Sequence, residues 1–411
     1  MKLSTAARST LIMGSLVLCL SLGLRHGFGL FLGPVTEAND WSRGVFAFAI
    51  ALQNLIWGVA QPIAGMLSDR FGAKKTILVG AVLYILGLVG MAVSKDPLAF
   101  TMAAGLLIGV GLAGTTMPVV FGAISRTMPA HKRSMAFGVA MSVGSLGQFA
   151  MMPGVLGLIG GVGWSQTLVI MSAAAALMVP LAFGMNPKPT LGERTSPSAA
   201  VGEITGAVTG PTAGQAFRLA LRTRDFLLLS AAFFVCGFHV VFISTHLPAY
   251  ISDNGLDPSL GSVALALIGL FNVLGSLAAG WLGSRLPKNA VLACIYGARV
   301  VAFALFLWLP VSTVSVLVFA SVMGLLWLST VPLTNGIVAV MFGVKNLAML
   351  SGLVFVTHQV GSFLGGWLGG ALYDATGSYT VAWWLGIVLG LVAMSLHLII
   401  KERPVEPVQS Q

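Results

Sequence analysis

The chain has 411 residues, of which 57% are hydrophobic and only 8% are charged, and its net charge is +10. Soluble domains carry roughly a quarter charged residues, so a chain this apolar could not cover a surface that faces water. A lipid bilayer removes that requirement, and the 51 glycines suit the close packing of membrane helices. The composition therefore excludes a soluble protein and predicts an integral membrane protein.

Twelve apolar stretches are long enough to cross a bilayer, which takes about 20 residues. The first follows a basic N-terminus, is too long for a signal-peptide core and lacks a cleavage site, so we interpret it as a retained helix. The stretches are residues 10–32, 44–67, 76–94, 98–122, 134–158, 165–186, 226–251, 260–282, 290–309, 312–336, 348–371 and 379–400. The sequence thus predicts an all-α membrane protein with twelve transmembrane helices.

The longest polar stretch, residues 186–224, is rich in Gly, Ser, Thr and Pro and cannot bury a core. We interpret it as a mobile linker that divides the chain into six helices plus six. The predicted domains are an N-terminal bundle at residues 1–187 and a C-terminal bundle at residues 225–411, joined by the linker at residues 188–224.

Positive charges are distributed unevenly between the two sides of the predicted membrane. With a cytoplasmic N-terminus, all but four of the 22 Lys and Arg residues lie on the cytoplasmic side. Arg43 and Lys95 lie outside, and Arg25 and Arg299 lie within helices. This asymmetry satisfies the positive-inside rule and explains the net charge without a nucleic-acid partner. We expect a monomer in the cell membrane (the inner membrane of a bacterium), with both termini cytoplasmic.

The three cysteines, Cys19, Cys236 and Cys294, each stand alone in an apolar run. No pair has metal-ligand spacing and an odd number gives no disulfide framework, so we expect small core residues. No Ser-His-Asp set, metal cluster or phosphate-binding loop is visible in the sequence. We therefore expect neither an enzyme nor a receptor, and no cofactor or bound metal.

One motif lies between the second and third predicted helices: GMLSDRFGAKK, residues 65–75, which returns weakly as GWLGSR at residues 280–285. It resembles the signature loop of the major facilitator superfamily, G-x-L-a-D-r-x-G-r-k, and its position and spacing fit. The resemblance covers essentially the whole chain and implies a secondary transporter. Many such transporters are built by internal duplication, so we expect two pseudo-symmetric six-helix bundles around a central cavity.

We expect the motif to act as a gate through Gly65, Asp69, Arg70 and Gly72. Gly65 permits close helix contact, and Asp69 can accept hydrogen bonds from a neighbouring helix N-terminus or pair with a cytoplasmic arginine. Such a contact would hold the two halves in one conformation. The alternative is a turn whose charges only set topology. In the second copy Ser284 replaces the acid, so the contact there should be weaker.

Ionisable residues in the middle of the predicted helices are all basic, because each of the 12 acidic residues lies in a loop, a tail or at a helix end. A charge inside a membrane costs at least about 2.5 kcal/mol, so by default it marks function. The set comprises Arg25, His26, His239, His246, Arg299, His358 and, nearer a helix end, His397. With no buried acid to neutralise them, the two arginines need another anion, and a substrate is the obvious candidate.

Arg25 is the first candidate for binding a substrate anion, because the resemblance implies that helix 1 lines the central cavity. The alternative is a structural tie to backbone carbonyls or to an inter-helix network. His26 is a second candidate, but it points about 100° away from Arg25, so both cannot face the cavity equally. Arg299 lies on helix 9, which is peripheral in the resembled fold, and we favour a structural role there.

His239 and His246 lie two turns apart on helix 7 and share one face. By the offset of the repeat, His239 corresponds to Leu24, so the pair could face Arg25 across the cavity. Imidazole titrates near neutral pH, which suits proton coupling where no carboxylate is available. The alternative is polar contact between helices, or a gate element beside Pro248.

Three further candidates for substrate contact lie on helices that border the cavity in the resembled fold. They are His358 and Gln359 in the middle of helix 11, and Asn272 in the middle of helix 8.

The segment GFGLFLGP, residues 27–34, followed by DWSR, residues 40–43, resembles the start of monocarboxylate-transporter-like members of the superfamily. These members move small carboxylates with protons and have a basic residue in helix 1, which Arg25 or its neighbour would supply. The acid and the carboxylate-binding arginine usual in their helix 8 are replaced here by Asn272 and Ser276.

We therefore predict a proton-linked uptake carrier for a small organic anion, a carboxylate, that works by alternating access. Arg25 would hold the carboxylate with help from the histidines, and one or more histidines would carry the proton. The competing interpretation is a proton-driven exporter of drugs or other small amphiphilic compounds. Against it, the helix 4 arginine typical of such exporters is Gly105 here, their helix 5 Gly-Pro pair is missing, and no buried carboxylate would attract a cationic drug.

Overall fold

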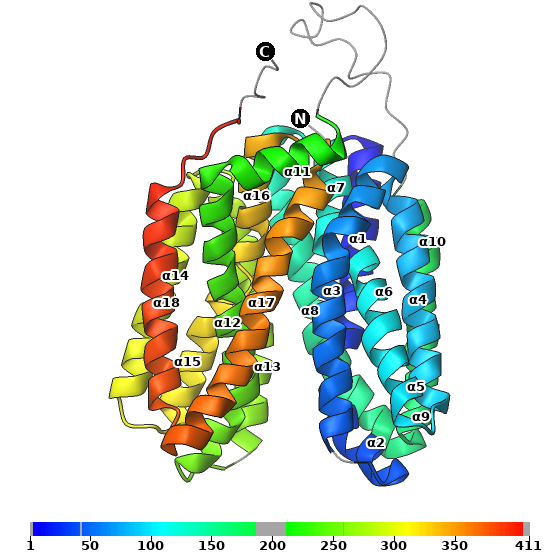
Figure 1. Ribbon diagram of the computed structural model, residues 1–411, viewed down its shortest axis with the longest axis vertical. Coiled ribbons are helices and arrows are strands. Elements are labelled where there is room, and N and C mark those ends of the chain that lie inside the picture. The colour runs from blue at the N-terminus through cyan, green and yellow to red at the C-terminus, as the bar shows by residue number, and fades with distance from the viewer. Residues whose placement is uncertain (1–2, 42, 186–210, 258, 406–411) are drawn as a thin grey trace, which may run out of the picture.

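The computed structural model of the protein describes residues 3–185 and 211–405, apart from residues 42 and 258. Within this part of the chain, twelve helical stretches are long and apolar enough to cross a membrane, which confirms the predicted fold class. Figure 1 shows them as two bundles side by side, with both chain termini at the same end. We call this the termini end of the molecule.

The first bundle contains six spans, several of which are built from more than one helical segment. Its elements are α1 (Thr5–His26), η1 (Gly27–Phe31), α2 (Leu32–Asn39), α3 (Arg43–Phe71), α4 (Ala73–Val93), α5 (Pro97–Thr101), the π-helical η2 (Met102–Leu107), α6 (Ile108–Thr115), α7 (Met117–Thr127), α8 (Ala130–Val162), α9 (Trp164–Ala176) and α10 (Met178–Phe183).

The second bundle repeats this layout. Its elements are α11 (Ala213–Arg222), α12 (Arg224–Asp253), α13 (Ser259–Leu282), α14 (Lys288–Trp308), α15 (Thr313–Leu326), α16 (Thr330–Phe342), α17 (Leu347–Thr376) and α18 (Thr380–Ile399).

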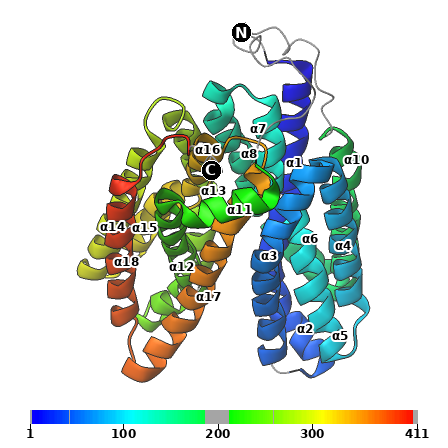
Figure 2. The same cartoon turned by 45° about the horizontal axis from the view of Figure 1, so that its top comes forward.

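Part of the stretch expected to be a mobile linker is helical. Residues 186–210 lie outside the described part of the chain, but α11 follows at once and lies across the termini end of the second bundle (Figure 2). A capping box between Thr212 and Gln215 starts this helix by satisfying backbone N–H groups. The Asn346 side chain donates to the carbonyl of Pro211 at 3.0 Å, which fixes the start of α11 beside the start of α17.

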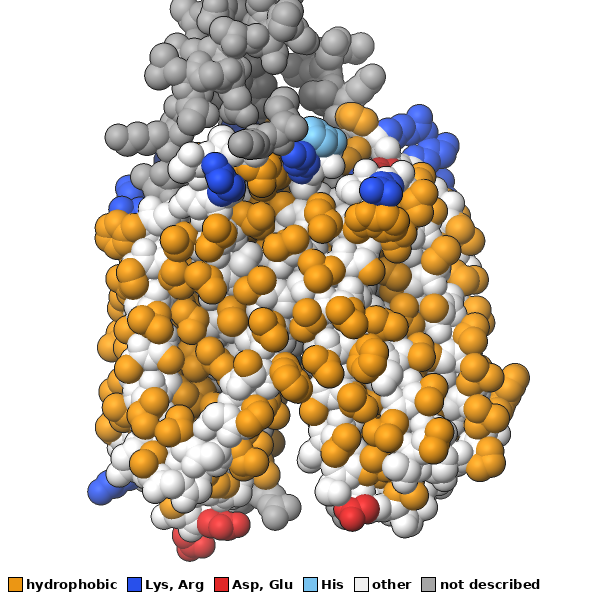
Figure 3. Space-filling model, turned by 180° about the vertical axis from the view of Figure 1, so that it is seen from behind, with side chains coloured by type: hydrophobic (Ala, Val, Ile, Leu, Met, Phe, Trp, Pro, Cys, Tyr) orange, Lys and Arg blue, Asp and Glu red, His pale blue; other side chains and the backbone are white. Residues whose placement is uncertain are grey.

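The two bundles meet at the termini end and separate at the opposite end, where Figure 3 shows a cleft between them. One seam joins α3 to α17 and the other joins α8 to α13. In the second seam, the Ser142 hydroxyl donates to the carbonyl of Val273 at 2.8 Å. Exposed Lys and Arg side chains gather at the termini end and acidic ones at the cleft end, as the charge asymmetry of the sequence requires.

The fourth and tenth spans are both broken in the middle, at matching places in the repeat. The first break separates α6 from α7 at Thr116, and the second separates α15 from α16 just before Thr330. Each threonine is followed two residues later by a proline, Pro118 or Pro332, which cannot donate a helical hydrogen bond. This Thr-x-Pro repeat was available in the sequence but is easily missed, because it interrupts spans that otherwise look continuous.

Candidate functional site

Arg25 projects from the end of α1 toward α3 and is only half-buried. One terminal nitrogen donates to the Oδ1 atom of Asn54, and the guanidinium carbon lies 5.0 Å from the centre of the Trp57 ring. Both partners are neutral, and Nε has no hydrogen-bond partner among the described residues. Within the same part of the chain, the recorded ion pairs are Arg126–Asp69 and Lys288–Glu402, so no carboxylate neutralises Arg25.

Trp57 is the central residue of α3 and connects the two halves of the molecule. Its indole N–H points to Gln61 Oε1 at 2.9 Å and Thr116 Oγ1 at 3.1 Å, so the ring is held from the first bundle. The ring centre lies 4.9 Å from that of Phe355 on α17, in the second bundle. The sequence analysis missed Trp57, although its position in mid-helix sets it apart from tryptophans that anchor helix ends.

On the opposite side, α17 presents two polar residues near this aromatic contact. The Gln359 side chain donates to the backbone carbonyl of Asn54 at 3.1 Å, across the seam. The His358 ring is 7% exposed and lies between Phe233 and Phe355, at centroid distances of 4.9 and 5.3 Å. Its Nδ1 atom is buried and has no hydrogen-bond partner among the described residues.

We call Arg25, Asn54, Trp57, Phe355, His358 and Gln359 the central site. Its members come from both bundles: Arg25 lies at the end of α1, and the others lie in the interior of α3 and α17. The recorded polar contacts between α3 and α17 run from Asp69 with Met349 near the termini end to Asn54 with Gln359 in the central site. Figure 3 shows the two halves separated at the opposite end.

The structure does not bring the helix 7 histidines together with Arg25. His239 and His246 do lie on one side of α12, but this side packs against other helices of the second bundle. His239 Nε2 lies 2.8 Å from the carbonyl of Gly386 on α18, and His246 Nε2 lies 2.8 Å from the carbonyl of Gly366 on α17. Both rings thus connect helices of one bundle, which was the alternative interpretation. His26 is exposed, and its Nδ1 atom lies 2.9 Å from the carbonyl of Leu22.

Asn272 lies in the α8–α13 seam and is fully buried. Its side chain donates to Ser145 Oγ of the other bundle at 2.7 Å, while its Oδ1 accepts the backbone N–H of Leu328 at 3.0 Å. The amide nitrogen of Asn272 therefore connects the two bundles, and its amide oxygen binds the backbone at the break in the tenth span. This placement is in the closed seam, outside the central site.

Arg299 is completely buried and has the geometry of a structural tie. One terminal nitrogen donates to the carbonyl of Leu326 at 2.7 Å and also to that of Trp327. These carbonyls belong to the end of α15, where the helix breaks and leaves them without helical donors. Arg299 therefore satisfies the broken backbone of the tenth span, as the peripheral position of its helix led us to expect.

We expect Arg299→Ala to destabilise the protein by about 2–4 kcal/mol, since it leaves two buried carbonyls unsatisfied and a cavity behind. Thermal unfolding of the detergent-purified protein measures the effect. Arg285→Ala is the control, because Arg285 is exposed and lies over the Trp281 ring at 4.2 Å. Equal melting temperatures for the two variants would contradict the structural role.

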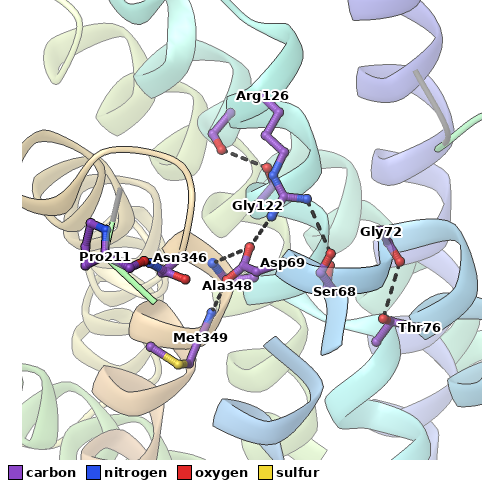
Figure 4. A network of polar contacts seen from close by, with 11 residues as sticks. Ser68, Asp69, Gly72, Thr76, Gly122, Arg126, Pro211, Asn346, Ala348 and Met349 are labelled. Atoms are coloured by element: carbon purple, nitrogen blue, oxygen red, sulfur yellow. Dashed lines mark hydrogen bonds and ion pairs between the residues drawn. The ribbon is translucent and has the colours of Figure 1, made fainter. Parts of the chain in front are cut away.

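The motif at the end of α3 forms a polar network at the termini end (Figure 4). Asp69 accepts the backbone N–H of Met349 at 2.9 Å and that of Ala348 at 3.4 Å, both at the start of α17. The same carboxylate pairs with Arg126 of α7, which also donates to the carbonyl of Ser68 at 3.3 Å. A carboxylate at a helix N-terminus is favoured by the helix dipole and by the free N–H groups there.

The glycines of the motif are required by the backbone. A Cβ atom on Gly65 would overlap the backbone of Ala348, so only glycine lets α3 approach the start of α17 this closely. Gly72 has a φ of 92°, a conformation that residues with side chains rarely adopt. Together the two positions bring Asp69 to the N-terminus of α17 and turn the chain into α4.

The cytoplasmic arginine that pairs with Asp69 is Arg126, whereas Arg70 is exposed and lies over its neighbour Phe71 at 5.1 Å. The sequence could not choose between them, since several cytoplasmic arginines lie within reach of a flexible side chain. In the second copy of the motif, Ser284 stands in place of the acid. Its hydroxyl donates to the carbonyl oxygen of Trp281 in its own turn at 2.7 Å, in keeping with the weaker contact between the halves that we expect from this copy.

Two bundles of membrane-spanning helices that meet at one end and separate at the other, with the central site between them, have the arrangement of a membrane transporter. The chain belongs to the major facilitator superfamily, whose family model matches residues 11–343. Monocarboxylate transporter 11 of Mus musculus is 28% identical over 383 residues, which cover 88% of this chain and 80% of that one. The uncharacterized MFS-type transporter YcxA of Bacillus subtilis is 24% identical over 389 residues, which cover 92% and 90%.

Solved structures show the same fold. The E. coli fucose:proton symporter FucP superposes with a TM-score of 0.73 at 16% identity, over 97% of this chain and 100% of that one. The proton:xylose symporter XylE gives a TM-score of 0.74 at 14% identity, over 96% and 95%. The protein is thus a multi-pass membrane transporter related to monocarboxylate transporters, and its superfamily consists of transporters and not of enzymes.

Proposed function

We propose that the protein takes up a small organic carboxylate together with protons by alternating access. The observation that carries this proposal is Arg25, a guanidinium in the central site whose described partners are an amide oxygen and an aromatic ring. A cation within a membrane protein by default marks a functional site, and an anionic substrate entering from the cleft would neutralise it. The names of the relatives, monocarboxylate and proton symport, agree with this chemistry.

We assign the proton to His358 in preference to His239 and His246, whose Nε2 atoms are engaged with backbone carbonyls. His358 lies in the central site with Nδ1 free. On the side of α12 it faces the thiol of Cys236, which in turn lies 3.8 Å from a terminal nitrogen of Arg299. Across the seam, Arg25 lies over the Trp57 ring, which contacts Phe355 beside His358. A second positive charge on His358 would favour an anion between the two halves.

In this proposal the termini end faces the cytoplasm, because the positive charges gather there. The protein works as a monomer in the cell membrane, or the inner membrane of a bacterium. The bundles of residues 1–187 and 225–411 rock against each other, connected by the linker of residues 188–224. Gly65, Asp69 and Gly72 hold the cytoplasmic side shut while the cleft is open.

We expect uptake of a small carboxylate into proteoliposomes to be faster when the outside is more acidic. With one proton per anion, each unit of imposed pH difference supports up to about tenfold accumulation. His358→Gln keeps a hydrogen-bonding side chain but cannot titrate, so its uptake should lose the dependence on outside pH. His397→Gln, at the far end of α18, is the control and should keep it. Uptake that ignores the pH gradient in the parent protein would exclude proton coupling.

The second candidate function is proton-driven export of drugs or other amphiphilic compounds. The same proteoliposomes discriminate the two, because extrusion of a lipophilic dye would support export. A cationic central site disfavours the cationic drugs that such exporters carry. The export assay should therefore use neutral or anionic amphiphilic compounds.

A further inference from the structure

A small closed hollow lies between the bundles, on the termini side of the central site. It has about 10 Å³ for the centre of a water molecule, which is the room that one water needs. Met117 and Pro118 of α7 form its wall in the first bundle. In the second bundle its wall comes from α12, α16 and α17 and includes Phe355, which also belongs to the central site.

Three polar atoms in this wall have no hydrogen-bond partner among the described residues. They are the Thr334 and Ser351 hydroxyl oxygens and Asn335 Oδ1, on side chains that are 2%, 5% and 6% exposed. The orientation of the Asn335 amide is fixed, because its nitrogen donates to the carbonyl of Val331 at 2.8 Å. Buried polar atoms are almost always satisfied, so three around one hollow indicate a missing partner inside it.

The hollow lies between the gate and the central site along α17. Ser351 comes half a turn after Met349, whose N–H is bound by Asp69, and two turns before His358. Residues three, four and seven positions apart share a face of a helix, so Ser351, Phe355 and His358 form a continuous stripe. A molecule that leaves the central site toward the termini end would follow this stripe to Ser351 and so pass the polar side chains of the hollow, Thr334, Asn335 and Ser351.

We propose that Thr334, Asn335 and Ser351 form an inner station that holds a water molecule in this conformation and binds the departing substrate when the gate opens. This rests on the proposed function. Two hydroxyls can donate or accept, whereas the amide oxygen only accepts. Such a set matches water, and it matches the protonated form of a carboxylic acid, which needs one acceptor and one donor. The station thus favours release of the acid with its proton.

Reactivity of a thiol at the station tests whether it opens. Ser351→Cys is made in a chain with Cys294→Ser, since Cys294 is exposed, and a small charged thiol reagent is added from the termini side. We expect slow labelling with the gate intact and labelling at least tenfold faster after Asp69→Asn. Ser230→Cys is the control, because Ser230 is similarly buried but its hydroxyl already donates to Phe226 at 2.9 Å. Equal acceleration at both cysteines, or none at Ser351→Cys, would overturn the proposal.

A second pair of variants tests the polar chemistry without relying on the gate variant. Thr334→Val and Ser351→Ala remove the hydroxyls while nearly keeping the shape. If the hollow is dry and idle, these changes should raise the melting temperature and leave uptake unchanged, which would contradict the station. We expect no rise in melting temperature and uptake reduced several-fold. Absence of carboxylate uptake by the parent chain would instead count against the proposed function. The labelling of Ser351→Cys does not depend on which substrate is carried.

Discussion

Replacing Arg25 by alanine is expected to lower the initial rate of carboxylate uptake by about 30- to 4,000-fold. Truncating one partner of a buried, hydrogen-bonded charge pair costs about 2–5 kcal/mol, and every 1.4 kcal/mol is a factor of ten. Arg25 has no carboxylate partner in the described protein, so its removal orphans no acid and the fold should persist. Uptake by purified protein in proteoliposomes, normalised to the reconstituted amount, measures the effect.

Two further variants make this experiment specific. Arg25→Lys keeps the charge but loses the planar fork and the stacking on Trp57, so it should recover only part of the activity. Arg8→Ala removes an exposed arginine from the termini end of the same helix and should transport normally. If Arg25→Ala takes up carboxylate like the parent chain, Arg25 has no part in substrate binding.

Asp69→Asn is expected to weaken the closed gate by about 1.5–3 kcal/mol, the usual contribution of hydrogen bonds to a charged group. The amide has nearly the shape of the carboxylate but loses the ion pair with Arg126 and one acceptor for the N–H groups of α17. The ratio of molecules closed at the termini end to molecules open there should fall accordingly, by about tenfold to 150-fold. Distances between spin labels at the ends of α3 and α17 measure this population.

Arg126→Gln should give a smaller shift than Asp69→Asn, because the two N–H groups of α17 still hold the carboxylate. Asp253→Asn is the control, since Asp253 is an exposed acid at the end of α12. A distance distribution for Asp69→Asn that matches the parent protein would mean that the motif sets topology without acting as a gate.

The spans and the contact of Asp69 could be predicted from sequence because each has a local cause. About twenty apolar residues in a row favour a membrane helix, and the contact of Asp69 with a helix N-terminus follows from a short motif. The division of the chain at a linker remains a prediction, and α11 begins earlier than a structureless linker would allow.

The orientation of polar side chains could not be predicted in the same way. Periodicity correctly placed His239 and His246 on one face, but a helix inside a bundle has several buried faces, and these rings point to α18 and α17. The partners of Asn272 could not be predicted for a similar reason, since Ser145 lies in the other bundle and Leu328 at the break of the tenth span. The contact of Trp57 with Phe355 of the other half is likewise encoded by no local pattern.

The two seams between the bundles differ in the chemistry that holds them. The α3–α17 seam carries the charge of Asp69, whereas the recorded bonds of the α8–α13 seam, such as that from Asn272 to Ser145, are neutral. Ionic strength and acidity should therefore change the opening of the α3–α17 seam more than that of the α8–α13 seam. The salt concentration and the pH at the termini end would then control how readily this one edge separates.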